Sequence, residues 1–150
     1  MKKIFDSLDY HAQTGKVLAS VERDGFEFRA SMKDDECADL SHLGEFSNSP
    51  ADKFSIKHDG GRGTFEYFNA ENVSDDNEAK QNYDRARTYN ETWVMYGLVV
   101  NVYKKDVKLA GASLWGIESD SGEEYFLQVF NDLADEALTQ AQEKLKELVS

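Results

Sequence analysis

The most regular pattern of apolar positions lies in the C-terminal part of the chain. Apolar side chains recur there at intervals of three and four residues, the spacing of one face of an α-helix. This stripe consists of Phe126, Val129, Phe130, Leu133, Ala137, Ala141, Leu145 and Leu148. The pattern predicts a single helix over Gly122–Val149 that covers one face of a sheet.

Shorter stretches alternate apolar and polar side chains, as half-buried strands do. They predict two hairpins: Val17–Glu22 with Phe26–Met32, and Phe54–His58 with Thr64–Phe68. The first closes through Asp24-Gly25, a dipeptide typical of tight hairpin turns. The second closes through Asp59–Gly63, which is glycine-rich but opens no helix. We therefore interpret that loop as a turn and not as a phosphate-binding loop.

Two further strands and a helix are predicted in the second half of the chain. Trp93–Tyr103 is apolar on both faces, as a central strand is, and Val107–Trp115 follows it after a short turn. Gly116 is expected to end this last strand. Asp75–Tyr89 is predicted to be a polar helix, with Ala79, Tyr83 and Ala86 on its inner face. Both tryptophans, Trp93 and Trp115, are expected in the core.

These elements predict an α+β fold, with an antiparallel β-sheet of about six strands. A long C-terminal helix and a shorter mid-chain helix pack on the sheet. Lys33–Asp52 is expected to be an acidic connector that packs through Leu40, Leu43 and Phe46. The pattern of residues 1–15 fits either a short helix or an arm.

The stretch Leu114–Tyr125 joins the last strand to the last helix. Its Ser119, Asp120 and Ser121 are competent helix caps, and Ser121 with Glu124 forms a capping-box pattern. Its acids, including Glu118 and Glu123, are also hard oxygen ligands suited to Ca²⁺ or Mg²⁺. Their spacing does not match an EF-hand loop. Capping by Asp120 or Ser121 is the favoured interpretation, and no metal site is predicted.

The composition indicates one folded domain. The chain has 150 residues, of which 40% are hydrophobic. No apolar run approaches the ~20 residues that span a bilayer, and no secretory signal is expected. One cysteine, Cys37, fits a reducing cytoplasm. With this single cysteine and three scattered histidines, no structural zinc site is expected.

The net charge of −12 is concentrated in two stretches. Ser31–Pro50 carries five acids against Lys33, and Leu109–Glu143 carries eight acids against no base. Such a surface repels phosphate, so direct binding of nucleic acid is disfavoured. Solubility is the simplest alternative explanation of the charge.

No catalytic signature accompanies this charge. His11, His42 and His58 have no nucleophile or metal partner nearby in the sequence, and acids around Cys37 disfavour its thiolate. We therefore expect neither an enzyme nor a cofactor.

Several short motifs resemble those of a known family. They are Leu43-Gly44-Glu45-Phe46-Ser47, the segment Asn82–Asn90, Trp93 with Gly97, and Leu114–Ser121, which reads LWGIESDS. Over roughly residues 40–140 the chain is similar to small uncharacterised proteins carried by phages, prophages and plasmids. The resemblance implies a mobile-element accessory protein in a bacterial cytoplasm, and it supplies no functional residues.

This context favours a non-enzymatic, nucleic-acid-mimicking inhibitor of a host defence complex, such as a CRISPR or restriction effector. The partner would be a host protein with a basic nucleic-acid-binding surface. The predicted partner-binding residues are Glu118, Asp120, Glu124, Asp132, Asp135 and Glu136. The alternative is a general interaction module or a regulator of phage or plasmid replication. The oligomeric state stays open.

Overall fold

The structure is a computed structural model that describes residues 3–9, 16–58 and 64–149. Its contacts divide the chain into two compact units, each described by itself. The first unit is Met1–Glu36 with Val94–Ser150, and the second is Cys37–Trp93. The predicted α+β class, with its long C-terminal helix and shorter mid-chain helix, is confirmed. That the two units fold together as a single domain stays a prediction.

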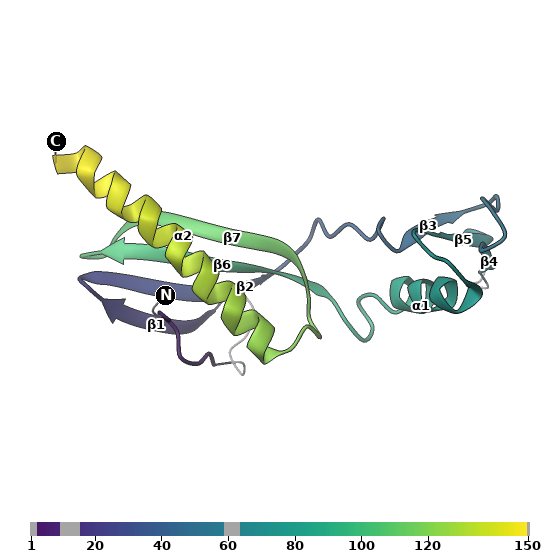
Figure 1. The fold of residues 1–150 in the computed structure, drawn as a ribbon, viewed down its shortest axis with the longest axis horizontal. Helices are drawn as coiled ribbons and strands as arrows, with labels where there is room; N and C mark the ends of the chain where they lie inside the picture. The colour runs from purple at the N-terminus through teal and green to yellow at the C-terminus, as the bar shows by residue number, and fades with distance from the viewer. Residues whose placement is uncertain (1–2, 10–15, 59–63, 150) are drawn as a thin grey trace. The chain divides into compact units, whose positions relative to one another are not determined.

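The first unit holds an antiparallel sheet with the strand order β1-β2-β6-β7 (Figure 1). Its strands are β1 (Val17–Arg23), β2 (Phe26–Asp34), β6 (Met95–Lys104) and β7 (Val107–Glu118). The predicted turn Asp24-Gly25 joins β1 to β2, and both of its residues have positive φ angles. Because β2 pairs directly with β6, the intervening segment must leave this sheet and return to it.

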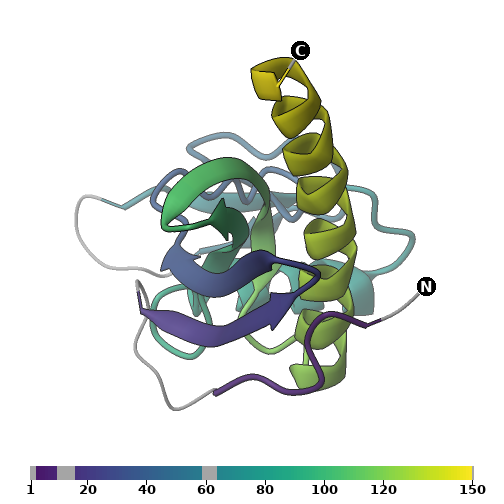
Figure 2. The ribbon, with the colours of Figure 1, turned by 90° about the vertical axis from the view of Figure 1, so that its left-hand side faces the viewer.

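Helix α2 (Glu123–Val149) covers one face of the sheet and contacts β6 and β7 (Figure 2). Most of the predicted stripe is buried, and Phe130 is fully buried. Leu148 is an exception, with 65% of its surface exposed. In Figures 1 and 2 the last turns of α2 extend past the strands, which agrees with the exposure of this end of the helix.

Two irregularities in β7 change which side chains face the core. Val102 pairs with Ala110 and Tyr103 with Lys108, so Leu109 is an extra residue that bulges from the ladder. A bulge reverses the alternation of side chains. For this reason Leu109 and Ala112 are both buried, although the simple alternation places them on opposite faces.

The expectation that Gly116 ends the strand is wrong. β7 continues to Glu118, and Gly116 lies in a second bulge between the pairs Tyr96–Ile117 and Leu98–Leu114. The φ angle of Gly116 is 74°, a conformation that glycine adopts without the strain of a side chain. The amide of Gly116 donates to Asp35 Oδ2 at 2.9 Å, which satisfies a group that leaves the ladder.

The second unit has its own three-stranded sheet with the order β3-β5-β4, and not a share of one six-stranded sheet. The elements are β3 (Gly44–Ser47), β4 (Ile56–Lys57), β5 (Tyr67–Ala70) and α1 (Asp76–Arg87). β4 and β5 form the predicted second hairpin, whose loop Asp59–Gly63 lies outside the described residues. β3 comes from the segment expected to be a connector, and α1 contacts all three strands.

Candidate interaction surface

The acidic side chains of α2 project from the face that turns away from the sheet. Because Phe126, Phe130 and Leu133 are buried, residues about half a turn from them point outward. Glu124, Asp132 and Glu136 are exposed, and Asp135 is half-buried. Asp132, Asp135 and Glu136 are three and four residues apart and are neighbours on one face. We call Glu124, Asp132, Asp135 and Glu136 the acidic helix face.

None of these four carboxylates takes part in a hydrogen bond or an ion pair with another described residue. In contrast, Asp84 of α1 is paired with Arg87, and Glu27 of β2 is paired with Arg29. Unpaired carboxylates keep their full charge toward solvent and toward any basic molecule that approaches. The acidic helix face therefore forms no ion pair within the described part of the chain, although the basic Lys3 lines the hollow beside it.

A hollow of about 460 Å³ opens beside this face. It is lined by Lys3, Glu124, Leu127, Gln128, Asn131, Asp132 and Asp135. Three of the six predicted partner-binding residues thus meet in one depression. Glu136 shares their helix face but does not line the hollow, and neither do Glu118 at the end of β7 and Asp120 in the following turn.

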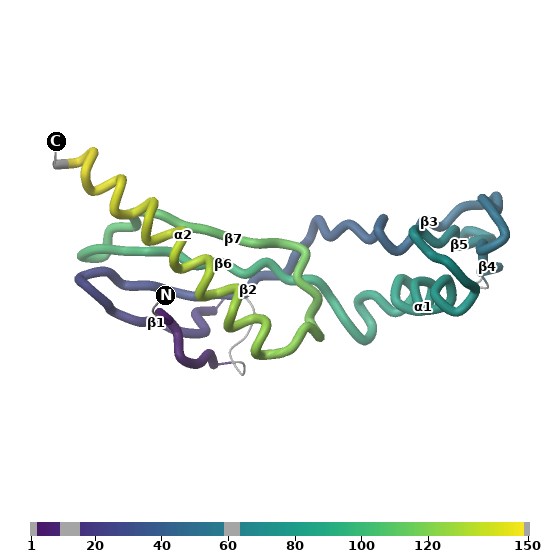
Figure 3. The backbone as a smooth tube through the Cα atoms, viewed as in Figure 1, coloured from purple at the N-terminus to yellow at the C-terminus, as the bar shows by residue number. Residues whose placement is uncertain are grey.

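Lys3 is the lining residue that comes from the N-terminal segment. This segment is irregular over residues 3–9 (Figure 3). Asn131 fixes it in place. Asn131 Oδ1 accepts from the amides of Ile4 and Phe5 at 2.9 and 2.8 Å, and its Nδ2 donates to the Phe5 carbonyl at 3.0 Å. The Phe5 ring packs edge-on against Phe130, with 6.5 Å between centroids. Residues 10–15 lie outside the described residues.

Sequence reasoning missed Lys3, Leu127, Gln128 and Asn131 as members of this surface. One signal was present: a helix-interior asparagine commonly uses its short amide for a specific hydrogen bond. Its partner could not be predicted, because Phe5 and Asn131 are 126 residues apart in sequence.

Of the two predicted caps of α2, Ser121 is engaged elsewhere, and capping by Asp120 stays a prediction. Gly122 occupies the position before the first helical residue, and its carbonyl accepts from the Phe126 amide at 3.1 Å. The Ser121 hydroxyl donates to the Glu118 carbonyl at 2.7 Å, so it closes the turn instead of capping the helix. Within residues 3–9, 16–58 and 64–149, no group of three or more His, Cys, Asp or Glu residues could hold a metal ion.

The expectation that both tryptophans are core residues is half right. Trp93 is buried, whereas Trp115 is 47% exposed. Trp115 lies against Gly97 on the sheet face opposite α2, where a β-carbon at position 97 would stand 2.1 Å from its ring. Its Nε1 donates to the Ser113 hydroxyl at 3.2 Å. A half-exposed indole is the kind of side chain that anchors protein interfaces.

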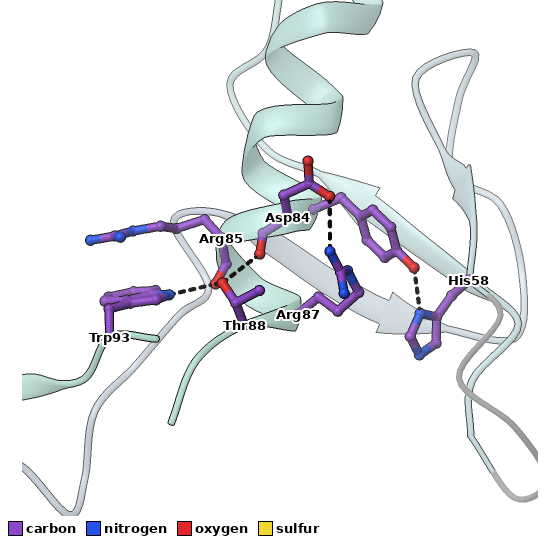
Figure 4. Close-up of polar contacts among 7 residues, drawn as sticks. His58, Asp84, Arg85, Arg87, Thr88 and Trp93 are labelled. Atoms are coloured by element: carbon purple, nitrogen blue, oxygen red, sulfur yellow. Dashed lines mark hydrogen bonds and ion pairs between the residues drawn. The ribbon is translucent and has the colours of Figure 1, made fainter. Parts of the chain in front are cut away.

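The second unit uses its aromatic side chains internally. Phe46, Phe68, Tyr83 and His58 form one cluster, and His58 Nδ1 lies 2.8 Å from the Tyr83 hydroxyl (Figure 4). His58 is therefore packed among the aromatic side chains of this unit. Trp93 Nε1 donates to the Arg85 carbonyl at 2.7 Å, and the Arg85 guanidinium lies over the indole. His42 and Cys37 are exposed, and His11 lies outside the described residues.

Two hydrogen-bonded charges lie away from the acidic helix face. The pKa of Asp39 is lowered because its carboxylate accepts from the Ser41 amide, at 2.9 Å. The pKa of Arg29 is raised because its Nε donates to Glu27, and its guanidinium also lies 4.0 Å from the centre of the Tyr103 ring. These contacts stabilise local structure.

No helix within the described ranges is both long enough and apolar enough to cross a membrane. Comparisons with protein-family models, with curated proteins and with solved structures gave no match.

Proposed function

We propose that this chain is a non-enzymatic accessory protein of a mobile element, acting in the bacterial cytoplasm as an acidic inhibitor. It would occupy the basic nucleic-acid-binding surface of a host defence complex, such as a CRISPR or restriction effector. The observation that carries the proposal is the acidic helix face, whose four carboxylates have no partner among the described residues.

The geometry of α2 suits this task. Glu124 and Glu136 are twelve residues apart, which corresponds to ~18 Å along a helix. The buried stripe beneath them holds the helix on the sheet, so the backbone that carries the charges keeps its position. A basic groove that normally binds phosphates could meet this array without the entropy cost of ordering the helix itself. The resemblance of the LWGIESDS motif to proteins of mobile elements supports the same context.

A second candidate is a general interaction module or a regulator of phage or plasmid replication. The half-exposed indole of Trp115 favours it, because large aromatic side chains are frequent anchors of protein interfaces. The two candidates differ in their salt dependence. A complex formed through the acidic helix face should weaken steeply with salt, and one formed through Trp115 should not.

The test compares two triple variants with the same change in charge. One reverses Asp132, Asp135 and Glu136 to lysine, and the other reverses Glu36, Glu71 and Glu91, which are exposed and lie outside α2. Binding and displacement of DNA are measured for purified CRISPR and restriction effectors at two salt concentrations. We expect the first variant to lose inhibition and most of its salt dependence, and the second to keep both.

Equal losses of inhibition in the two variants would mean that inhibition depends only on the net charge of the chain. This result would contradict a specific binding surface. Equal activity of the first variant and the wild type would contradict the proposal directly.

A further inference from the structure

The hollow beside α2 combines an apolar wall with an acidic rim. Leu127 is partly buried and contributes apolar surface, and the polar residues Gln128 and Asn131 also line the hollow. Glu124, Asp132 and Asp135 contribute three carboxylates. Lys3 is the one basic residue of this lining, and it is exposed. The lining is therefore suited to a molecule with a hydrocarbon stem and a cationic head.

The half-buried position of Asp135 further favours a ligand with a cationic head. Its side chain is half-buried, yet within the described part of the chain no base is paired with it. A carboxylate that is partly removed from water gains more from a cation than a fully exposed one does. Asp132 lies one turn before it on the same face, so both can reach a single bound group.

We propose that this hollow receives an arginine side chain of the basic partner protein. The inference deepens the proposed function and rests on it for the existence of that partner. The arginine stem would lie along Leu127, and its planar guanidinium would form paired hydrogen bonds with Asp132 and Asp135. Lysine would fit less well, because its compact ammonium cannot bridge two carboxylates as a planar fork does.

The N-terminal segment makes the site specific to the folded chain. Asn131 holds Ile4 and Phe5 against α2, and this contact places Lys3 at the rim. An isolated acidic helix would lack Lys3, the one lining residue that lies outside α2. Recognition of arginine thus depends on contacts between the two ends of the sequence, and removal of the Lys3 charge should strengthen it.

The experiment uses blocked hexa-arginine and hexa-lysine peptides as probes of the intact chain. Binding is followed by calorimetry and by NMR shifts of the Leu127 methyl groups and the Asn131 side-chain amide. At about 0.3 M salt the screening length is ~6 Å, so diffuse attraction is suppressed. The variants are Asp132→Asn, Asp135→Asn and Lys3→Gln. Glu143→Gln is the control, since Glu143 is an exposed acid of α2 outside the hollow.

We expect hexa-arginine to bind about tenfold more tightly than hexa-lysine, with shifts centred on Leu127 and Asn131. Asp132→Asn and Asp135→Asn should each weaken hexa-arginine about five- to tenfold, Lys3→Gln should strengthen it, and Glu143→Gln should change it less than twofold. Undetectable binding would overturn the proposal. So would equal affinity for both peptides, or equal losses in Asp132→Asn and Glu143→Gln.

The two proposals can fail separately. If effectors are inhibited through the acidic helix face but hexa-arginine does not select the hollow, only the arginine site is wrong. If hexa-arginine selects the hollow but no effector is inhibited, the recognition chemistry holds and the proposed function is wrong.

Discussion

The side-chain amide of Asn131 binds the backbone of Phe5 on both sides, accepting from its amide and donating to its carbonyl. Asn131→Ala would leave the amides of Ile4 and Phe5 without this acceptor in a partly buried place. We expect a loss of ~1–3 kcal/mol in the free energy of unfolding, measured by urea denaturation. Gln128→Ala, an exposed change on the same helix, should cost less than ~0.5 kcal/mol. Similar losses of unfolding free energy in both variants would mean that Asn131 does not hold the N-terminal segment on α2.

Phe130 is the fully buried centre of the α2 stripe and also contacts Phe5. Phe130→Ala removes a whole ring and leaves a cavity, so it should destabilise the fold by ~3–5 kcal/mol. Leu148→Ala is the control, because Leu148 is 65% exposed and its truncation should stay within ~0.5 kcal/mol. Calorimetric unfolding of both variants checks this. A small shift for Phe130→Ala would show that α2 does not dock through that residue.

Gly97 leaves room for the Trp115 ring. Replacing a strand glycine by alanine usually stabilises, by ~0.5–1 kcal/mol, but here the new methyl group would collide with the indole. We expect Gly97→Ala to destabilise the chain and to shift the Trp115 emission to the red, with buried Trp93 as the constant background. In a Trp115→Ala chain the same change should be neutral or stabilising. If Gly97→Ala destabilises the Trp115→Ala chain as much as it destabilises the wild type, the collision with the indole is not the cause.

The turn between β7 and α2 is expected to be structural. Titration with Ca²⁺ or Mg²⁺, followed by calorimetry, should give no tight, stoichiometric heat, because the acids of this turn are explained by the turn and the helix start. Ser121→Ala should cost ~0.5–1.5 kcal/mol by removing the hydrogen bond to the Glu118 carbonyl. Stoichiometric heat that disappears in Asp120→Ala would contradict this account and favour a metal site.

The Asp39 carboxylate titrates at a lower pH in the folded chain than in the unfolded chain, because the Ser41 amide donates to its ionised form. The stabilisation is therefore present above the unfolded pKa of ~3.9 and is lost as pH falls through the folded value. Ser41→Pro removes the donor. An NMR titration should place the Asp39 midpoint closer to ~3.9 in that variant than in the wild type. Equal midpoints would mean that this hydrogen bond does not lower the pKa.

Local patterns were enough to predict several elements of this protein. The three- and four-residue spacing of Phe126, Phe130 and Leu133 places α2 on a core, whatever lies beneath it. Asp24-Gly25 closes its hairpin because both residues tolerate positive φ angles. The charge of α2 is equally local, since residues opposite a buried stripe must face solvent. These features depend on neighbours within a few residues, which the sequence itself supplies.

Other features were decided only by contacts between distant residues. The direct pairing of β2 with β6 separates the intervening residues into a second sheet and turns a presumed connector into β3. The bulges at Leu109 and Gly116 reverse the alternation of β7, and the Trp115 ring lies outside the core, against Gly97. The hollow needs Asn131 to hold Phe5 across almost the whole chain. Strand register, bulges and the docking of a terminal segment depend on which distant surfaces pack together. The periodicity of apolar residues along the chain does not predict that packing.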